Sequence, residues 1–326
     1  GAMAVDAASA PRILIVRRDN IGDLACTTPL LEALRAQLPR AWLGALVTTY
    51  NAEVLARNPA LDEIFVYEKL KHRSSGLIAH LRSRIGQMSR LRRRKLDCVL
   101  VPAPAPQSLK IARSLRPGQV IAAPVTFPAR MHEVERTFAL GRSLGVTGTP
   151  GPLRIFPDAK EVLELKQRIG AGPFTAVHIS ARRPAQRWPL DRYAALAARL
   201  SKQGPVLLLW APGSNDNPRH PGDDEPAAEI LRIATSQASA PVIPLATPNL
   251  KALIAALSLA DRVVCPDGGA MHLAAALGKP VVALFGDSPV ERWRPWGVAH
   301  RVVRPASGNL ADLPLEPVLE AFRALG

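Results

Sequence analysis

An acidic residue behind the first apolar run is a candidate for proton transfer. Residues 17–29 read Arg-Arg-Asp-Asn-Ile-Gly-Asp-Leu-Ala-Cys-Thr-Thr-Pro, and Gly22 would allow a tight turn or a close backbone approach just before Asp23. A helix N-terminus favours the carboxylate form, so we expect Asp23 to be ionised and able to accept a proton from a hydroxyl group. The same position also suits a simple N-cap, and position alone does not separate the two roles.

A glycine-containing string in the second half could hold an anion. Residues 265–278 read Cys-Pro-Asp-Gly-Gly-Ala-Met-His-Leu-Ala-Ala-Ala-Leu-Gly, so a strand ends at Asp267 and a helix follows. Gly268 and Gly269 would expose backbone N–H groups there, which suits a diphosphate. The string equally suits an N-cap with close helix packing, and His272 fits a packing residue as well as a ligand contact.

A basic loop adds further anion donors. Residues 178–189 read His-Ile-Ser-Ala-Arg-Arg-Pro-Ala-Gln-Arg-Trp-Pro, and four side chains there can donate to phosphate oxygens: Ser180, Arg182, Arg183 and Arg187. Trp188 and Pro189 are typical of a stiff approach to a helix. Together these segments predict phosphate binding in the second half and an acid–base residue in the first.

Short β-branched runs alternate with helical patterns along the chain, which is typical of parallel sheets with crossover helices. In the first half we expect strands at Arg12–Arg18, Ala41–Thr48, Glu63–Glu68, Asp97–Pro102 and Gln119–Ala123. Leu30, Leu31, Leu34 and Leu38 share one face of the first helix, which Pro39 ends. A helix over Met131–Leu144, stopped by Gly145, closes this half.

A second alternation follows the turn-rich segment 147–152. The predicted strands are Phe174–Ile179, Pro205–Trp210, Pro241–Pro244, Arg262–Pro266 and Pro280–Phe285, and the predicted helices are Leu190–Lys202, Pro226–Ser236, Asn249–Ala260, Ala270–Leu277 and Leu315–Leu325. The stretch 215–225 is expected to be an exposed loop.

The sequence therefore predicts an α/β protein with two doubly wound, Rossmann-like domains facing a central cleft. We expect a disordered tag or tail at 1–11, a first domain at 12–150 and a second at 151–326, with a last helix that could pack back on the first domain.

Positive charge is concentrated in one segment. The chain has 42 Lys and Arg against 27 Asp and Glu, a net charge of +15, and the segment 69–95 contains ten basic residues and no acid. Its densest part is Arg90, Arg92, Arg93 and Arg94. Such a patch attracts an anionic membrane or polymer, although a solvated helix face has the same composition. No aromatic residue lies in the segment to stack on bases, which disfavours a nucleic-acid-binding protein.

Several classes are disfavoured by missing motifs. Neither half contains the dinucleotide-binding or P-loop glycine pattern, and no D-x-D or H-E-x-x-H motif offers metal ligands, so we expect no metal. Three distant cysteines fit a reducing compartment. No apolar run reaches the ~18 residues that span a bilayer, and residues 1–11 lack a secretory signal pattern, so a soluble protein is expected.

Five segments occur in a fixed order along the chain: residues 12–35, the His132-Glu-Val-Glu-Arg136 segment, the Arg-Trp-Pro of 187–189, the Asp-Gly-Gly-Ala-Met-His of 267–272, and Phe-Gly-Asp-Ser-Pro with Pro-Trp-Gly within 285–297. In these segments and their order, over about residues 12–300, the chain resembles the ADP-heptose:lipopolysaccharide heptosyltransferases of glycosyltransferase family 9.

The resemblance implies a glycosyltransferase-B architecture and an inverting, metal-independent transfer of heptose from ADP-heptose to the Kdo or heptose inner core of lipopolysaccharide. It implies that Asp23 is the general base and that the second domain holds ADP, with donor contacts from Ser180, Arg182, Arg183, Gln186, Arg187, Asp267, Gly268, Gly269, Met271 and His272. The acceptor side would contain Asn20, Gly22, His132 and Arg136. No cofactor beyond the donor is implied, and we expect a cytoplasmic monomer at the inner face of a bacterial inner membrane.

Two positions depart from the family pattern. Gln186 stands where a lysine commonly contacts the donor phosphates, and Gly268 stands where a threonine is usual. The acidic residue that would bind the donor ribose is not identifiable in 211–216. Another nucleotide sugar, or a glycan or protein acceptor outside lipopolysaccharide, therefore remains an alternative, as does a basic nucleic-acid-binding protein.

Overall fold

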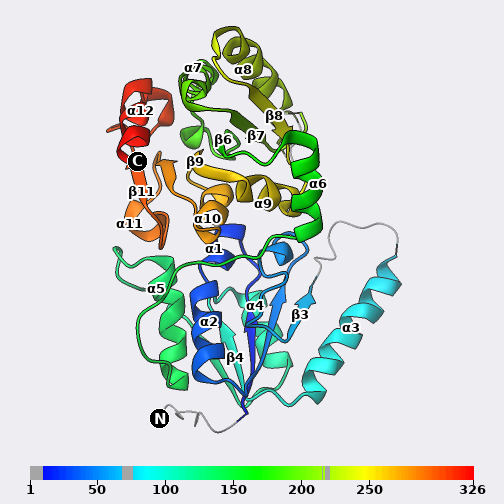
Figure 1. Ribbon diagram of the computed structural model, residues 1–326. Helices are drawn as coiled ribbons and strands as arrows, with labels where there is room; N and C mark the ends of the chain where they lie inside the picture. The colour runs from blue at the N-terminus through cyan, green and yellow to red at the C-terminus, as the bar shows by residue number, and fades with distance from the viewer. Residues whose placement is uncertain (1–9, 68–75, 215, 217–220) are drawn as a thin grey trace. The chain divides into compact units, whose positions relative to one another are not determined.

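The computed structural model describes residues 10–67, 76–214, 216 and 221–326, and the chain forms two compact units, Gly1–Gly151 and Pro152–Gly326 (Figure 1). The boundary between them falls within the turn-rich segment 147–152. Glu68 of the third predicted strand, Lys69, Lys71 and Arg73 of the basic segment, and most of 215–220 lie outside the described residues.

The first unit is built on a five-stranded parallel sheet with the order β3-β2-β1-β4-β5. Its strands are β1 (Arg12–Val16), β2 (Trp42–Val47), β3 (Glu63–Val66), β4 (Cys98–Val101) and β5 (Gln119–Ala122). Ile13 pairs with Leu43 on one side and with Cys98 on the other, which makes β1 the central strand. Residues 13–16 are at most 1% exposed because helices cover both faces of a doubly wound sheet.

The helices of this unit are α1 (Ile21–Ala25), α2 (Thr28–Gln37), α3 (Leu77–Arg93), α4 (Pro106–Ser114) and α5 (Glu133–Phe138), with short 3₁₀ turns at Ala52–Val54 and Ala139–Leu144. Asp23 lies in the first turn of α1, and the leucine-rich helix that follows is a separate helix, α2, which begins at Thr28. Pro29 lies in the first turn of α2, where its missing N–H costs nothing.

The predicted single helix over Met131–Leu144 is wrong in its extent. It begins at Glu133 with His132 as N-cap and tightens into a 3₁₀ stretch from Ala139. Gly141 lies in that stretch, where an added Cβ would meet Leu30 at 2.9 Å, and glycine's low helix propensity fits the early end of α5. Gly145 then ends the segment with a left-handed φ of 86°, as expected of a helix-stopping glycine.

The second unit contains a six-stranded parallel sheet with the order β11-β10-β9-β6-β7-β8. Its strands are β6 (Phe174–His178), β7 (Val206–Trp210), β8 (Val242–Ala246), β9 (Ala260–Pro266), β10 (Val281–Leu284) and β11 (His300–Val303). β11 was not predicted, because an edge strand is only half buried and His300-Arg-Val-Val lacks a continuous apolar run. Two parallel sheets in two units confirm the predicted doubly wound α/β class.

The helices of the second unit are α6 (Ala159–Ile169), α7 (Leu190–Leu200), α8 (Asp224–Gln237), α9 (Leu250–Ser258), α10 (Gly269–Ala276), α11 (Val290–Trp293) and α12 (Leu315–Ala324), with 3₁₀ turns at Pro184–Gln186, Ser201–Gln203 and Leu310–Asp312. α12 packs against β10, β11 and α7 of the same unit. Its Phe322 joins Tyr193, Leu196 and Leu208 in one apolar core. In the described part of the chain, no helix has the length and apolar character needed to cross a membrane.

Gly286, just after β10, is a position where only glycine fits. A Cβ there would lie 2.4 Å from the backbone oxygen of Ala185 and 3.1 Å from that of Gly308. The loop before α7 and the loop after β10 are therefore in direct backbone contact.

We predict that Gly286→Ala lowers the free energy of unfolding by ~1 to 3 kcal/mol, because two backbone segments must move to admit the methyl group. Urea unfolding followed by circular dichroism measures the effect. Gly86→Ala is the matched control, since a Cβ at Gly86 meets nothing within 4 Å and alanine favours the helix there. Equal stability of the two variants would contradict this account of the loop contact.

Candidate functional site

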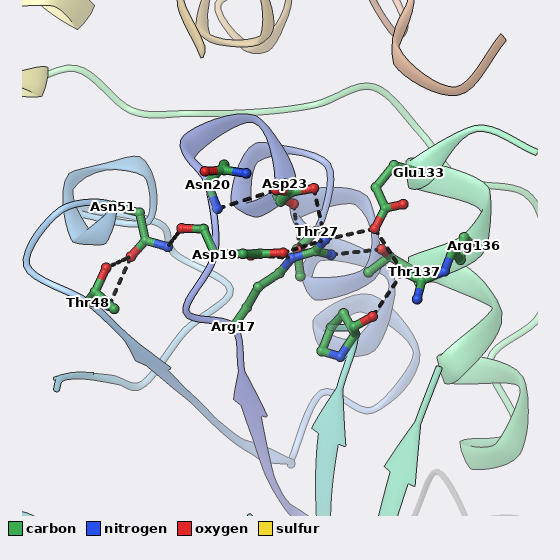
Figure 2. Close-up of polar contacts among 11 residues, drawn as sticks. Arg17, Asp19, Asn20, Asp23, Thr27, Thr48, Asn51, Glu133, Arg136 and Thr137 are labelled. Carbon is green, nitrogen blue, oxygen red and sulfur yellow. Dashed lines mark hydrogen bonds and ion pairs between the residues drawn. The ribbon is translucent and has the colours of Figure 1, made fainter. Parts of the chain in front are cut away.

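A buried guanidinium organises the carboxyl edge of the first sheet. Arg17 follows β1, is 1% exposed, and contacts three carboxylates: Asp19 at 3.0 Å, Asp23 at 3.3 Å and Glu133 at 2.7 Å (Figure 2). Its Nη1 also donates to the hydroxyl oxygens of Thr27 at 3.2 Å and Thr137 at 3.0 Å. All three guanidinium nitrogens of Arg17 are therefore engaged by this network.

Asp23 lies in the first turn of α1 and points into this network. One oxygen accepts from Arg17 Nη2 at 3.3 Å, and the other accepts from the backbone N–H of Asn20 at 3.3 Å. Burial is the largest influence and raises the pKa of Asp23 to about 6, while Arg17 opposes the rise and the charges of Asp19 and Glu133 add to it. Asp23 is thus a stronger base than an exposed aspartate, yet is largely ionised at neutral pH.

A helix N-terminus lowers the pKa of a carboxyl group, but burial raises the pKa of Asp23 and is the larger influence. Asn20 occupies the N-cap position, and Asp23 is three residues further on, so the simple N-cap role for Asp23 is wrong. Gly22 is a buried interior residue of α1, not part of a tight turn.

His132 and Arg136, expected on the acceptor side, have structural partners in the first unit. His132 is fully buried and its Nδ1 accepts from the backbone N–H of Val134 at 3.0 Å. Arg136 donates to Glu133 at 3.0 Å and to the backbone oxygen of Pro102 at 2.9 Å. Glu133 therefore bridges two guanidiniums, and Arg136 belongs to the same network as Asp23.

The loop after β1 also contacts Asn51, in the loop after β2. Asn51 donates to the backbone oxygen of Asp19 at 3.2 Å, and its own side-chain oxygen accepts from the backbone N–H of Thr48 at 2.9 Å (Figure 2). This contact ties the loop after β1 to the loop after β2. The residues 17–20 are consequently fixed by neighbours on both sides of the central strand.

The predicted donor residues of the second unit gather at the carboxyl edge of its sheet. Gln186 is 3% exposed; its amide nitrogen donates to Ser288 at 2.9 Å and its amide oxygen accepts from the backbone N–H of Gly286 at 3.0 Å. A lysine could donate to Ser288 but could not accept from Gly286. The glutamine thus makes a loop contact that a lysine could not make.

The arginines of the same loop differ in their surroundings. Arg183 is exposed and pairs with Asp287 at 2.9 Å and with the Ser288 hydroxyl at 2.7 Å. Arg187 pairs with the buried Asp223 at 3.2 Å. Arg182 is exposed. The loop therefore presents one guanidinium engaged by a buried carboxylate and two on the surface.

Ser180 accepts from the backbone N–H of Ala211 at 2.9 Å, which joins the loops after β6 and β7. Asp267 follows β9; burial raises its pKa, and the Ser288 hydroxyl and Arg183 oppose the rise. Gly268 precedes α10, and an added Cβ there would meet nothing within 4 Å, so the backbone at the start of α10 is open to close approach. The side chains of Met271 and His272 are buried, and the His272 ring lies 5.9 Å from that of Trp293.

The basic patch Arg90, Arg92, Arg93 and Arg94 lies at the opposite, amino edge of the first sheet. Arg94 stacks 4.2 Å from the ring of Trp42 at the start of β2, and Arg90 and Arg94 each pair with Glu63 at 3.4 Å at the start of β3. Arg92 donates to the backbone oxygen of Ser114, and Arg93 to that of Ser89. The patch is therefore far from Asp23 along the strands.

The sequence did not predict four members of this network: Arg17, Asp19, Glu133 and Thr137. Arg17 and Glu133 are 116 residues apart, and no spacing rule joins them. The available signal was a charged residue at the end of the central apolar strand, because such a group must be paired when buried. Among the described residues, no cluster of His, Cys, Asp and Glu side chains could hold a metal ion.

Comparison with known proteins identifies the family. The family model for glycosyltransferase family 9 (heptosyltransferase) matches residues 115–319, which is more than half of the chain. This chain belongs to glycosyltransferase family 9. It is a glycosyltransferase of the heptosyltransferase type, as the motif order predicted.

Full-length relatives agree with this assignment. The lipopolysaccharide heptosyltransferase 2 of Salmonella typhimurium is 27% identical, with 96% of this chain and 98% of that protein covered. The structure of Escherichia coli ADP-heptose LPS heptosyltransferase II has a TM-score of 0.76 at 23% identity, covering 96% of this chain and 98% of that one. E. coli heptosyltransferase WaaC with ADP-2-deoxy-2-fluoro heptose has a TM-score of 0.72 at 21% identity, covering 97% and 100%. The two structures confirm the glycosyltransferase-B type of fold.

The raised pKa of Asp23 has a consequence for stability. An aspartate whose pKa is higher in the folded than in the unfolded chain destabilises the fold once it ionises, so its cost grows as pH rises from about 4 to about 6. We predict that Asp23→Asn raises the free energy of unfolding at pH 7 by ~1 to 3 kcal/mol and has little effect at pH 4.

Urea denaturation at several pH values measures this difference. Asp191→Asn is the matched control, because Asp191 also lies in the first helical turn, of α7, but is exposed. We expect that variant to stay within ~0.5 kcal/mol of the wild type. A loss of stability in Asp23→Asn at pH 7 would show that the ion pair with Arg17 outweighs the cost of burial.

Proposed function

We propose that this protein transfers heptose from ADP-heptose to the inner core of lipopolysaccharide, a Kdo or heptose residue, by an inverting mechanism without a metal ion. The observation that carries the proposal is the Asp23 carboxylate, held at the carboxyl edge of the first sheet by buried Arg17 with its pKa raised to about 6. The names of the relatives, which include lipopolysaccharide heptosyltransferases and an ADP-heptose analogue complex, support the donor and acceptor classes.

Asp23 accepts the proton of the acceptor hydroxyl in this mechanism. As it loses its proton, the acceptor oxygen attacks the anomeric carbon of the heptose from the face opposite the ADP leaving group. The bond between the anomeric carbon and the ADP oxygen then breaks, and the configuration at that carbon inverts. A base with a pKa near 6 is deprotonated at neutral pH and still accepts a proton more readily than an ordinary aspartate. Arg17 keeps the carboxylate in place through its contacts with Glu133 and the two threonines.

The second unit stabilises the departing diphosphate. Negative charge grows on the phosphate oxygens as the glycosidic bond breaks, and guanidinium and backbone N–H groups are the protein's donors for it. The proposed donors are Arg182 and Arg183 on the surface loop, the Ser180 hydroxyl, and the N–H groups of Gly268 and Gly269 at the start of α10. The exposed ion pair of Arg183 with Asp287 can open to receive a phosphate at small cost.

Several buried residues act in this scheme through the loops that they hold. Gln186, Arg187 and Asp267 fix the loops around the phosphate position, and Met271 and His272 pack α10 beneath it. On the acceptor side, Asn20 is exposed beside Asp23, whereas Gly22, His132 and Arg136 support the network from within the first unit. The enzyme acts at the cytoplasmic face of the inner membrane, where a lipid-linked anionic acceptor is presented.

We predict that Asp23→Asn lowers turnover by ~10²-fold or more, because the amide cannot take the hydroxyl proton. Transfer assays with ADP-heptose and a Kdo-containing acceptor measure it, and ADP affinity serves as the control that the second unit is intact. If the turnover of Asp23→Asn stayed within a few fold of the wild type, Asp23 would not be the general base.

The pH dependence of kcat/KM tests the same residue without removing it. We expect the wild-type rate to fall below pH 6 as Asp23 takes up a proton. In Asp19→Asn the acid limb should move to lower pH, because the Asp19 charge raises the pKa of Asp23. An unchanged acid limb in that variant would show that a different group controls the rate.

We predict that transfer continues at the same rate in excess EDTA and that magnesium adds nothing, because arginines and N–H groups stabilise the departing ADP. Activity lost in EDTA and restored by magnesium would contradict the proposed leaving-group chemistry.

Running the same assay over a panel of nucleotide sugars separates ADP-heptose from the other donors open to this family.

A further inference from the structure

The amino-terminal half of α3 carries an exposed apolar stripe. Of the eight large hydrophobic side chains that are exposed in the described residues, four lie on this one helix: Leu77 at 49%, Ile78 at 70%, Leu81 at 39% and Ile85 at 64%. Ile78, Leu81 and Ile85 are spaced three and four residues apart, so they share one face over two turns. Further along α3 the apolar residues Met88 and Leu91 instead pack on the core of the unit.

The charged residues of α3 all have the same sign. No Asp or Glu occurs from 76 to 96, whereas the exposed Arg82 lies within the stripe and the exposed Arg92 and Arg93 lie further along the helix. An exposed apolar stripe on a helix whose charged residues are all basic is complementary to an anionic lipid surface, which offers both hydrocarbon and negative headgroups. It is a poor match for nucleic acid, which offers charge without a compatible apolar layer.

The stripe lies near the functional edge of the sheet. Arg84, within the stripe's length, stacks 3.7 Å from the ring of Tyr67, which directly follows β3, and Arg18, which follows β1, lies 4.9 Å from the same ring. The amino-terminal half of α3 is therefore at the carboxyl edge that holds Asp23, and the arginine patch 90–94 is at the other end of the helix (Figure 1).

We propose that Leu77, Ile78, Leu81 and Ile85 insert into the interfacial region of an anionic membrane, so that the amino-terminal half of α3 lies closer to the membrane than its arginine-rich end. The inference rests on the proposed function in one respect, since a lipid-linked acceptor gives the enzyme a reason to be there. This placement brings the edge bearing Asp23 toward the membrane on which the acceptor is carried. It assigns membrane binding to the apolar half of α3 more than to Arg90–Arg94, several of which pair within the protein.

Vesicle binding of the whole 326-residue chain tests the proposal. Sedimentation with vesicles of phosphatidylglycerol and phosphatidylcholine should show binding of the wild type that falls ~10-fold or more in the triple variant Ile78→Ser, Leu81→Ser, Ile85→Ser. The control is Val125→Ser with Leu163→Ser, which removes two exposed apolar side chains elsewhere and should leave binding unchanged. Arg82→Gln with Arg93→Gln should weaken binding roughly fivefold per charge at low salt and less at high salt.

A site-specific probe covers the case in which the triple variant folds poorly. The three native cysteines are buried, so a fluorophore on Ile85→Cys reports one position. Its emission should shift to the blue with anionic vesicles, and the same label on Leu163→Cys should not respond. Equal vesicle binding of wild type and triple variant, or no shift at residue 85, overturns the proposal.

Two further outcomes separate this proposal from its alternatives. A wild-type dimer that the triple variant abolishes, with no vesicle binding by either, would assign the face to a second copy of the chain and overturn the membrane proposal. The second outcome is vesicle binding with the expected variant effects but no transfer to any lipopolysaccharide acceptor. That result would support the membrane-binding surface and contradict the proposed function.

Discussion

The buried guanidinium of Arg17 is the interaction on which the first unit's functional edge depends. An unpaired charge at 1% exposure would cost several kcal/mol, so the surrounding segments must supply partners. Asp19 comes from the loop after β1, Asp23 from α1, and Glu133 and Thr137 from α5. Three carboxylates face the two guanidiniums of Arg17 and Arg136, which leaves one negative charge in excess. Burial raises the pKa of Asp23 most, and the charges of Asp19 and Glu133 add to the rise, so the site that fixes the position of the carboxylate also makes it basic.

The second unit uses weaker and more exchangeable contacts at its own carboxyl edge. A neutral amide, Gln186, links two loops through Ser288 and Gly286, and the exposed Arg183 pairs with a carboxylate that is itself exposed. Exposed pairs contribute little to stability, so they can be exchanged for a ligand's phosphate at small cost. The two edges thus differ in the way that their proposed roles require: a base held rigidly in one unit, and cations available to a transient anion in the other.

The sequence predicted most of the fold because both sheets are buried on two faces and their strands are continuous apolar runs, as in β1 and β10. It missed β11, which is half exposed, and it overextended the helix that tightens at Ala139. The positions of Asp23 in the first turn of α1 and of Gly268 before α10 were predicted, because helix starts have local sequence signals. Arg17 and Glu133 were not, since their pairing joins distant segments and becomes evident only when β1 and α5 are placed side by side.

Direct titration of the Asp23 carboxyl group tests the central claim, that burial within the Arg17 network creates the base. Carbon-13 NMR of aspartate-labelled enzyme, with the Asp23 resonance assigned by its loss in Asp23→Asn, gives the pKa without reference to turnover. The account predicts a value of about 6 in the wild type. A value at or below ~4, as in an exposed aspartate, would contradict it.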